Sequence, residues 1–407
     1  MELKPKQGSL KIWMRRLVGV ALIVTVFVLG MAVGDGRINI NPRKQSVVAN
    51  ELSRRPDYNS VNEVYKSLRE NFDGELTDEQ VTNGLKHGLA DSTNDPYTVY
   101  LTPEEAKEFE GQLNNSFSGI GAQLGQDKDK NLEVIAAIDG LPADKAGVKA
   151  KDIIASINGQ STSGMSVDEA VGKIRGPKGT KVKLGIVRDR SEQLNFDITR
   201  EDIKLPSVKT KIIDGSIGYL QITTFSDDTI RLVNEAATDF KNKGVKAMIV
   251  DVRSNPGGLL DGAVSVSDLW LNQGQTILQE KRGGEVIKTY TAQNGGTFSG
   301  LPTVVLIDGG SASASEILAG ALRDNNSAYL IGEKSYGKGV VQQLINFGNG
   351  SQLKVTVASW FRPNGQNINK KGIQPDKVIK ISDEDAKADK DTQLQAAQDY
   401  LKTKLNQ

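Results

Sequence analysis

Three serines stand at alternate positions, Ser311, Ser313 and Ser315, between two apolar segments. The segment Thr303 to Ile307 is short and β-branched, which predicts a buried strand, and Ile317 to Leu322 resembles the apolar face of a helix. A strand-to-helix junction leaves backbone N–H groups unpaired at the positive end of the helix dipole, which favours developing negative charge. A serine placed there is either a helix cap or a nucleophile.

A serine hydroxyl is a weak nucleophile and needs a base within hydrogen-bond reach. The single histidine, His87, lies far upstream between a lysine and a glycine, and we interpret it as a surface residue of a helix. Lys338 is the better candidate because it lies in a glycine-flanked loop after a second apolar segment, 327–331. A lysine acts as a base only when burial lowers its pKa, because the neutral amine is scarce at a reference value near ~10.4. The Ser–Lys variant of the catalytic triad supplies this chemistry.

The stretches 310–317 and 332–342 together resemble the carboxyl-terminal processing (tail-specific) serine proteases, and the resemblance extends from about Val61 to Val378. It implies a cofactor-free endopeptidase with an acyl-enzyme intermediate. It also implies four catalytic-site residues: the nucleophile Ser313, its general base Lys338, the glutamine that orients the lysine, Gln342, and a further contact, Glu316.

A second loop, 253–258, follows the apolar run from Ala247 to Val252. Its paired glycines fit a tight turn with positive φ, or a turn that aims backbone N–H groups into a cleft as an oxyanion hole requires. In the family that the chain resembles, this loop forms the oxyanion hole together with the backbone after the nucleophile. The resemblance therefore implies Gly257 or Gly258, with Ala314, and leaves open which glycine serves.

The stretch 118–124 combines a glycine turn with an extended apolar strand. Such a turn can hold a carboxylate and such a strand can pair with an extended peptide, although a plain hairpin has the same local pattern. A helix at 166–174 and two strands, 182–188 and 194–199, follow, and the succession resembles a PDZ domain. The resemblance implies a carboxylate loop with an adjoining side-chain pocket, formed by Gly119, Ile120, Gly121 and Ala122 and by helix residues near Val167 and Val171.

The first 16 residues are rich in lysine and arginine, and Leu17 to Gly34 then holds 18 residues without a charge. That length is just enough to cross a bilayer core, and the basic flank would stay in the cytosol. A cleaved signal peptide is the alternative, since Ala32 to Gly34 offers small residues, and a buried core helix is a third interpretation. The uninterrupted span favours a retained anchor, with the catalytic part outside the cell membrane.

Composition narrows the function further. A net charge of +1 gives no electrostatic case for binding nucleic acid. The chain has no cysteine, which removes disulfides and thiolate ligands, and a single histidine does not favour a zinc site. We therefore expect no metal and no other cofactor. Polypeptides with free carboxyl termini and the membrane are the expected partners, and self-association is left open.

The alternation of strands and helices predicts a mixed α/β protease core with parallel pairing, preceded by the PDZ domain and a small helical region. The helical region includes a segment, 95–101, that is typical of the family and to which we assign no chemistry. The expected divisions are a basic tail 1–16, a transmembrane anchor or signal 17–34, a linker 35–56, the helical region 57–116, the PDZ domain 117–200, the Ser–Lys protease core 201–381 and a charged, peripheral helical tail 382–407.

Two other functions fit part of the sequence. Gly332 to Lys338 matches most of a phosphate-binding loop, but Gly339 replaces the Mg²⁺-binding Ser or Thr, and 340–345 predicts a strand where a helix is needed. A membrane-anchored PDZ scaffold without activity would have no use for Ser313 and Lys338 together. The sequence therefore predicts a membrane-anchored serine endopeptidase that recognises the free carboxyl terminus of protein substrates.

Overall fold

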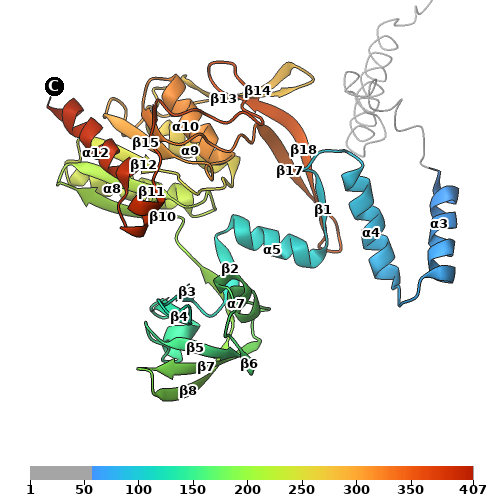
Figure 1. Ribbon diagram of the computed structural model, residues 1–407. Helices are drawn as coiled ribbons and strands as arrows, with labels where there is room; N and C mark the ends of the chain where they lie inside the picture. The colour runs from blue at the N-terminus through green and yellow to red at the C-terminus, as the bar shows by residue number, and fades with distance from the viewer. Residues whose placement is uncertain (1–56, 407) are drawn as a thin grey trace, which may run out of the picture. The chain divides into compact units, whose positions relative to one another are not determined.

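The structure is a computed structural model that describes residues 57–406, and Figure 1 traces its elements. These residues belong to two units, one that ends at Val81 and one that begins at Thr82. No helix within residues 57–406 has the length and the apolar composition needed to cross a bilayer. The predicted anchor, 17–34, lies outside the described residues.

The first unit contains α3 (Tyr58–Asn71) and the start of α4 (Asp78–Asp91). Asp57 caps α3, because its carboxylate accepts the N–H groups of two residues in the first turn. Thr77 and Gln80 form a capping box before α4. The amide of each residue donates to the side chain of the other, over 2.8 and 3.1 Å.

The main sheet of the second unit has six strands in the order β10-β11-β12-β15-β16-β19. Figure 1 labels its strands β10, β11, β12 and β15. Only β10 and β11 pair antiparallel, and the other neighbours are parallel. This agrees with the predicted alternation, because parallel neighbours need a crossover connection. The strands are β10 (Val208–Ile213), β11 (Ile217–Ile222), β12 (Ala247–Asp251), β15 (Thr303–Ile307), β16 (Tyr329–Gly332) and β19 (Lys377–Val378).

Helices cover both faces of this sheet, which explains why its central strands are apolar. All residues of β12 and β15 are buried, and their side chains alternate between two cores: Val250 and Val305 face one, Ile249 and Val304 the other. The first core also includes residues of three helices, and the second includes residues of one. These helices are α8 (Thr229–Asn242), α9 (Leu260–Asp268) and α10 (Ala314–Asp324) on the first side, and α12 (Thr392–Leu405) on the second.

The carboxyl-terminal segment is not the peripheral tail that its charges suggested. After the short helix α11 (Asp383–Lys387), α12 packs on the sheet and buries Ala397 and Leu401 completely. These two residues lie four positions apart and therefore share one face of the helix. The expectation relied on composition, whereas this spacing is what decides burial.

A second sheet of five strands carries the residues that follow Lys338. Its path is β1-β18-β13-β14, with β17 paired to β18. The pairing of β1 with β18 brings residues near position 100 against the carboxyl-terminal part of the chain. The elements are β1 (Val99–Leu101), the helix α5 that follows it (Pro103–Leu113), β13 (Thr276–Arg282), β14 (Glu285–Thr291), β17 (Val340–Asn346) and β18 (Gln352–Phe361).

The remaining strands lie between 116 and 204. The path β3-β4-β5-β7-β8, with β6 paired to β5, encloses a core of its own, and β2 pairs with β9. Helix α7 begins with a capping box at Ser166 and packs against β3. The elements are β2 (Ser116–Gly119), β3 (Ala122–Gln126), β4 (Leu132–Ala137), α6 (Pro142–Lys145), β5 (Ile153–Ile157), β6 (Gln160–Ser161), α7 (Val167–Ile174), β7 (Lys181–Arg188), β8 (Glu192–Thr199) and β9 (Glu201–Lys204).

Candidate active site

The two loops singled out in the sequence leave the same edge of the main sheet, because β12 and β15 are adjacent and parallel. Ser311 and Ser315 are buried, and each donates to the loop after β12: Ser311 Oγ to the Val252 carbonyl over 2.7 Å, and Ser315 Oγ to the Asn255 carbonyl over 3.0 Å. The hydroxyl of Ser313 lines a cleft at the N-cap of α10 and donates its proton to no described residue. Two serines therefore fasten the loops together, and one remains available.

Ser313 has an unusual backbone conformation at the start of α10. Its φ is +53° and its ψ is −112°, a region that residues with a Cβ rarely adopt. Neighbouring groups hold it there: its amide donates to the Glu316 carboxylate over 2.8 Å, and its carbonyl accepts the amides of Glu316 and Ile317, each over 2.9 Å. A sharp, strained strand-to-helix turn is a known way of exposing a serine hydroxyl above a sheet.

The structure distinguishes the two glycines that the sequence left equivalent. The Gly257 amide donates to Asn255 Oδ1 over 2.8 Å and is therefore occupied. The amides of Gly258 and Ala314 have no acceptor among residues 57–406. The two loops also approach closely, because a Cβ on Gly257 would lie 2.8 Å from the Cβ of Ser313. Each loop thus contributes an amide that has no acceptor within residues 57–406, Gly258 from one loop and Ala314, next to the serine, from the other.

Glu316 connects the serine turn with the lysine loop. Its carboxylate, on a residue only 1% exposed, accepts the amides of Ser313 (2.8 Å), Gly337 (2.7 Å) and Lys338 (3.0 Å) and the hydroxyl of Ser335 (2.5 Å). Burial raises the pKa of Glu316, and the four donors oppose that rise because they stabilise the anion. One side chain therefore fixes the backbone at both Ser313 and Lys338.

Lys338 lies in the loop between β16 and β17, and its Nζ donates to Gln342 Oε1 over 2.7 Å. Burial is the main cause that lowers the pKa of Lys338, and the positive charge of Lys354 lowers it further. The carboxylates of Asp95 and Glu316 act in the opposite direction. A lowered pKa increases the fraction of neutral amine, which is the form that can accept a proton.

A residue that the sequence did not indicate holds Gln342 in place. The Nε2 of Gln342 donates to the backbone carbonyl of Tyr97, 245 positions earlier, and the Tyr97 ring centroid lies 5.2 Å from Lys338 Nζ. Asp95 folds this segment by accepting the Tyr97 amide over 3.2 Å and the Thr98 hydroxyl over 2.7 Å. The segment 95–101 was assigned no chemistry, and the structure places part of it against the lysine. A contact through a main-chain carbonyl has no residue-type signature that could have predicted it.

Ser313, Lys338, Gln342 and the glycines of 257–258 line one cleft of about 320 Å³. An apolar lining with a few convergent polar groups is typical of substrate sites. The apolar part of the wall comes from α5, α9, α10, the loop before α9 and the second sheet, and includes Phe109, Leu113, Leu259, Leu260, Ile317, Val340, Val341, Leu344 and Trp360.

A second lysine, Lys354, lines the same cleft and was also missed. It lies on β18 opposite Leu344, two residues from the pair between Gln342 and Thr356, so it shares a face of the sheet with Gln342. Its Nζ stands 4.8 Å from the Phe109 ring centroid, and burial lowers the pKa of Lys354. Within the described chain this cleft is lined by two amines and by no carboxylate.

The phosphate-loop alternative receives no support from the local structure. The strand β17 begins at Val340, as the sequence predicts, so the lysine loop does not open into a helix. The amides of Gly337 and Lys338, which a phosphate would need, already donate to the carboxylate of Glu316. An anion at this loop would therefore have to displace a buried carboxylate.

The predicted carboxylate loop connects β2 with β3. The amides of Ile120 and Gly121 have no acceptor among the described residues, and Gly121 has a φ of +74°. A Cβ on Gly121 would meet the Leu141 Cβ at 2.5 Å, so glycine is required there. Of the other predicted residues, Gly119 ends β2, Ala122 begins β3, and Val167 and Val171 lie half-buried on α7, which packs against β3. One edge of β3 is unpaired in its sheet.

Comparison with known proteins agrees with this architecture. Residues 216–379 match the model of peptidase family S41, and residues 108–187 match the model of the PDZ domain. The carboxy-terminal processing protease CtpA of Bacillus subtilis (strain 168) is 38% identical over 328 residues, which cover 80% of this chain and 70% of the relative. CtpB of the same strain is 37% identical over 328 residues, which cover 79% of this chain and 68% of the relative.

Among solved structures, the photosystem II D1 C-terminal processing protease has a TM-score of 0.50 and 26% identity, and the match covers 80% of this chain and 87% of that chain. A mixed α/β core joined to a PDZ domain, with an available serine and a half-buried lysine in one cleft, places the molecule among the serine peptidases. The chain belongs to peptidase family S41, the carboxyl-terminal processing serine peptidases. The family predicted from the sequence is confirmed, as are the α/β core and the PDZ domain.

Proposed function

We propose that the chain hydrolyses peptide bonds through a dyad of Ser313 and Lys338. The neutral amine of Lys338 takes the hydroxyl proton as Ser313 Oγ attacks the carbonyl carbon of the scissile bond. The tetrahedral intermediate collapses, the C–N bond breaks, and the leaving amine takes the proton from Lys338. Water then attacks the acyl-enzyme ester in the same way and returns the free serine. The observation that carries this proposal is the shared cleft, with a serine hydroxyl that donates to no described residue and a lysine held by Gln342.

The oxyanion is stabilised in this proposal by the amides of Gly258 and Ala314. Both amides lack an acceptor among the described residues, and they come from the two loops that Ser311 and Ser315 fasten together. The Gly257 amide is excluded because it donates to Asn255. Fixed donors are effective because they need no reorganisation when charge develops on the carbonyl oxygen.

Three further residues act as positioning residues. Glu316 sets the serine turn relative to the lysine loop, through four hydrogen bonds to its carboxylate. Gln342 directs the Lys338 amine, and the Tyr97 carbonyl fixes the orientation of Gln342. The Tyr97 ring stabilises the ammonium that forms when Lys338 takes the proton, because an aromatic face attracts a cation.

The PDZ domain is proposed to capture the free carboxyl terminus of a polypeptide. The unpaired amides of Ile120 and Gly121 suit a carboxylate, and the unpaired edge of β3 suits the addition of an extended peptide strand. Val167 and Val171 on α7 would line the adjacent side-chain pocket. Residues 17–34 are proposed to anchor the chain in the cell membrane, with the catalytic part extracytoplasmic.

The test of the dyad compares the full chain in mild detergent with Ser313→Ala and Lys338→Ala, on an unfolded protein that ends in apolar residues. EDTA is present and ATP is absent. We expect cleavage by the unmodified chain and losses of roughly 10⁴–10⁶ in kcat for either variant. Removing one member of such a catalytic unit costs about as much as removing all of them, because each member needs the others. Retained activity in either variant would remove its residue from the dyad. Tail binding without cleavage by the unmodified chain would favour the scaffold function instead.

The test of tail capture uses one substrate with a free carboxyl terminus and the same substrate amidated. We expect amidation to raise KM with little change in kcat, because it removes binding energy remote from the reacting bond. Gly121→Ala should remove the discrimination, since its Cβ would meet Leu141. Equal KM values for acid and amide in the unmodified chain would contradict tail capture.

A further inference from the structure

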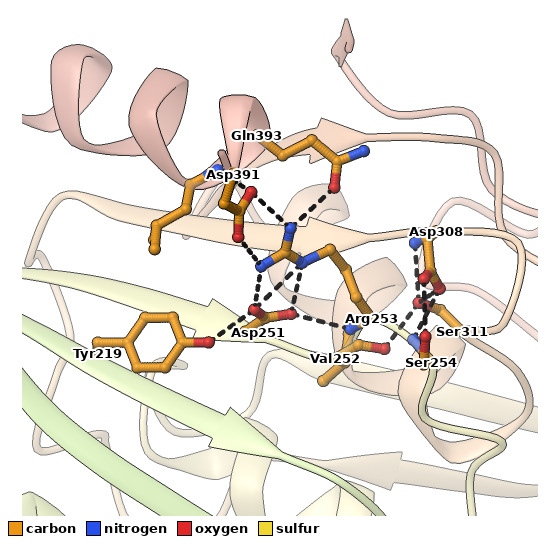
Figure 2. Close-up of polar contacts among 10 residues, drawn as sticks. Tyr219, Asp251, Val252, Arg253, Ser254, Asp308, Ser311, Asp391 and Gln393 are labelled. Atoms are coloured by element: carbon orange, nitrogen blue, oxygen red, sulfur yellow. Dashed lines mark hydrogen bonds and ion pairs between the residues drawn. The ribbon is translucent and has the colours of Figure 1, made fainter. Parts of the chain in front are cut away.

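Arg253 lies between β12 and the loop that carries Gly258, and all five of its side-chain N–H donors are used (Figure 2). Its Nε and Nη2 donate to Asp251, over 3.0 and 2.6 Å. Its Nη1 and Nη2 donate to the two carboxylate oxygens of Asp391, over 2.9 and 2.8 Å, and Nη1 also donates to Gln393 over 3.0 Å. A planar fork that grips two carboxylates holds the guanidinium in a single orientation.

The partners of Arg253 are themselves fixed. Asp251 is fully buried and accepts the Tyr219 hydroxyl over 2.8 Å. Asp391 is the N-cap of α12, where its carboxylate accepts the Leu394 amide over 2.9 Å. Burial opposes ionisation of Asp391, but the hydrogen bonds from Arg253 hold its pKa below the ordinary value. Arg253 therefore joins the end of β12 to the first turn of the carboxyl-terminal helix.

The next residues along the chain carry this constraint to the catalytic loop. Ser254 has a φ of +54°, and its amide and hydroxyl donate to Asp308 over 2.8 and 3.2 Å (Figure 2). The Asn255 side chain donates to the Ile222 carbonyl over 2.8 Å and accepts the Gly257 amide over 2.8 Å. The Gly258 amide therefore follows, within five residues, a side chain that is anchored to α12.

We propose that Arg253 is a positioning residue for the oxyanion hole, and that Asp391 and Gln393 on the carboxyl-terminal helix set the placement of the Gly258 amide through it. The proposal rests on the proposed function, because it assumes that this amide stabilises the oxyanion. No group of the network lines the substrate cleft. Disturbing the network should therefore change kcat and leave KM nearly unchanged.

Asp391→Asn is the decisive variant. Asparagine keeps a side-chain oxygen for the Leu394 amide and caps helices as well as aspartate does, so α12 should still begin in place. It removes the charge and one of the two acceptors that Arg253 uses. We expect kcat to fall by about tenfold, a fraction of the ~10²–10³ that losing an oxyanion donor costs. Asp391→Glu, which restores the carboxylate, should recover part of that loss.

The matched control removes a different ion pair of the same helix. Lys402 on α12 pairs with Asp214 over 2.6 Å, and both side chains are about half exposed. Asp214→Asn should leave kcat and KM within about twofold, because an exposed pair contributes little. A drop in kcat for Asp391→Asn no larger than for Asp214→Asn would overturn the proposal, and so would a parallel loss of kcat and folded fraction by circular dichroism.

A second measurement separates failure of this proposal from failure of the proposed function. A peptide aldehyde forms a hemiacetal with an active serine and places its oxygen in the oxyanion hole. Asp391→Asn should weaken aldehyde inhibition by about the factor that it lowers kcat, whereas the affinity for substrate should not change. Unchanged aldehyde inhibition in Asp391→Asn would contradict the positioning role of Arg253 and would leave the proposed dyad intact. An unmodified chain that neither cleaves substrate nor binds the aldehyde would contradict the proposed dyad as well.

If Asp391→Asn does not fold, Gln393→Met takes its place, because it removes one acceptor from Arg253. It should lower kcat and weaken aldehyde inhibition by about threefold each, with KM unchanged.

Discussion

The serine side and the lysine side of the cleft are built in different ways. On the serine side, the loops after β12 and β15 lie next to each other in one sheet and are joined by hydrogen bonds from buried serines. On the lysine side, Lys338 depends on Gln342 in the second sheet, and Gln342 depends on a carbonyl 245 positions away. The proposed nucleophile is thus positioned by neighbouring strands, and the proposed base by parts of the chain that meet only in the completed fold.

This difference shows where each side can be disturbed alone. Glu316 accepts amides from both sides, so it is the group that keeps them in register. A change in the 257–258 loop should affect the placement of the nucleophile and the oxyanion while the lysine keeps its surroundings. A change at Gln342 should affect the lysine while the serine turn is preserved. The two kinds of variant therefore test whether the sides are independent.

Gly257→Ala should have the largest effect of the changes that keep both proposed catalytic residues, Ser313 and Lys338. The new Cβ would lie 2.8 Å from the Ser313 Cβ, and the φ of +106° is unfavourable for alanine. We expect kcat to fall by about 10²–10³, as when an oxyanion donor is lost. The rate is measured beside Gly309→Ala, whose Cβ would meet nothing within 4 Å. Equal rates for the two variants would show that the serine side tolerates displacement.

Gln342→Ala should have an intermediate effect confined to the lysine side. The Lys338 amine loses its acceptor at 2.7 Å and is no longer directed. We expect kcat to fall by about tenfold, a fraction of the ~10²–10⁴ that a positioned base contributes, with KM unchanged. Gln343→Ala, an exposed neighbour on β17, provides the control. If the two variants behave alike, the lysine does not depend on this contact.

Lys354→Met should have the smallest effect, visible in the pH dependence. Lys338 must be neutral to act as a base, so kcat/KM rises with pH through its pKa in the free enzyme. Burial and the charge of Lys354 lower the pKa of Lys338, so this rise lies below the ordinary range near ~10.4. Without the repelling charge, protonated Lys338 becomes less unfavourable. The pKa of Lys338 therefore rises, and the rising part of the kcat/KM profile moves to higher pH. As a result, kcat/KM at neutral pH falls several-fold.

Lys354→Arg is the matched control for this experiment, because it keeps the positive charge. It should leave the rising part of the kcat/KM profile near its original pH. The plateau at high pH should be the same in all three proteins, since the base is then neutral in each. If the rising part of the profile does not move in Lys354→Met, burial alone lowers the pKa of Lys338. A lowered plateau would show instead that Lys354 contacts substrate.

Much of the site was predictable because residue types in fixed spacing carried it. Ser313 and Lys338 were candidates from their residue types and positions, Gln342 was implied by the resemblance of two short motifs to the family, and all three line one cleft in the structure. The main sheet was predicted from apolar, β-branched runs, since strands buried on both faces have this composition. The order of strands and the pairing of β1 with β18 were not predicted, because long-range pairing has no local pattern.

The rest of the site depends on backbone directions and on contacts over long distances. The sequence could not separate Gly257 from Gly258, because the difference lies in which amide Asn255 accepts. Tyr97 was not predicted, because it acts through its carbonyl. Lys354 was not predicted, because a lone lysine on a strand has the pattern of an exposed residue. The burial of α12 was within reach, since the spacing of Ala397 and Leu401 was readable and was outweighed by the surrounding charges.

The alternation of β12 and β15 between two cores has a consequence for inactivation by heat. Amide protons of these strands, such as those of Ile249 and Val305, should be among the slowest to exchange with solvent, because reaching them requires opening the whole sheet. The turn that carries Ser313 directly follows β15. Lys338 depends instead on Gln342, which is held by Tyr97 in the short segment before β1. On warming, the base should lose its alignment first, which would leave a folded, reversibly silent enzyme some degrees below the melting transition.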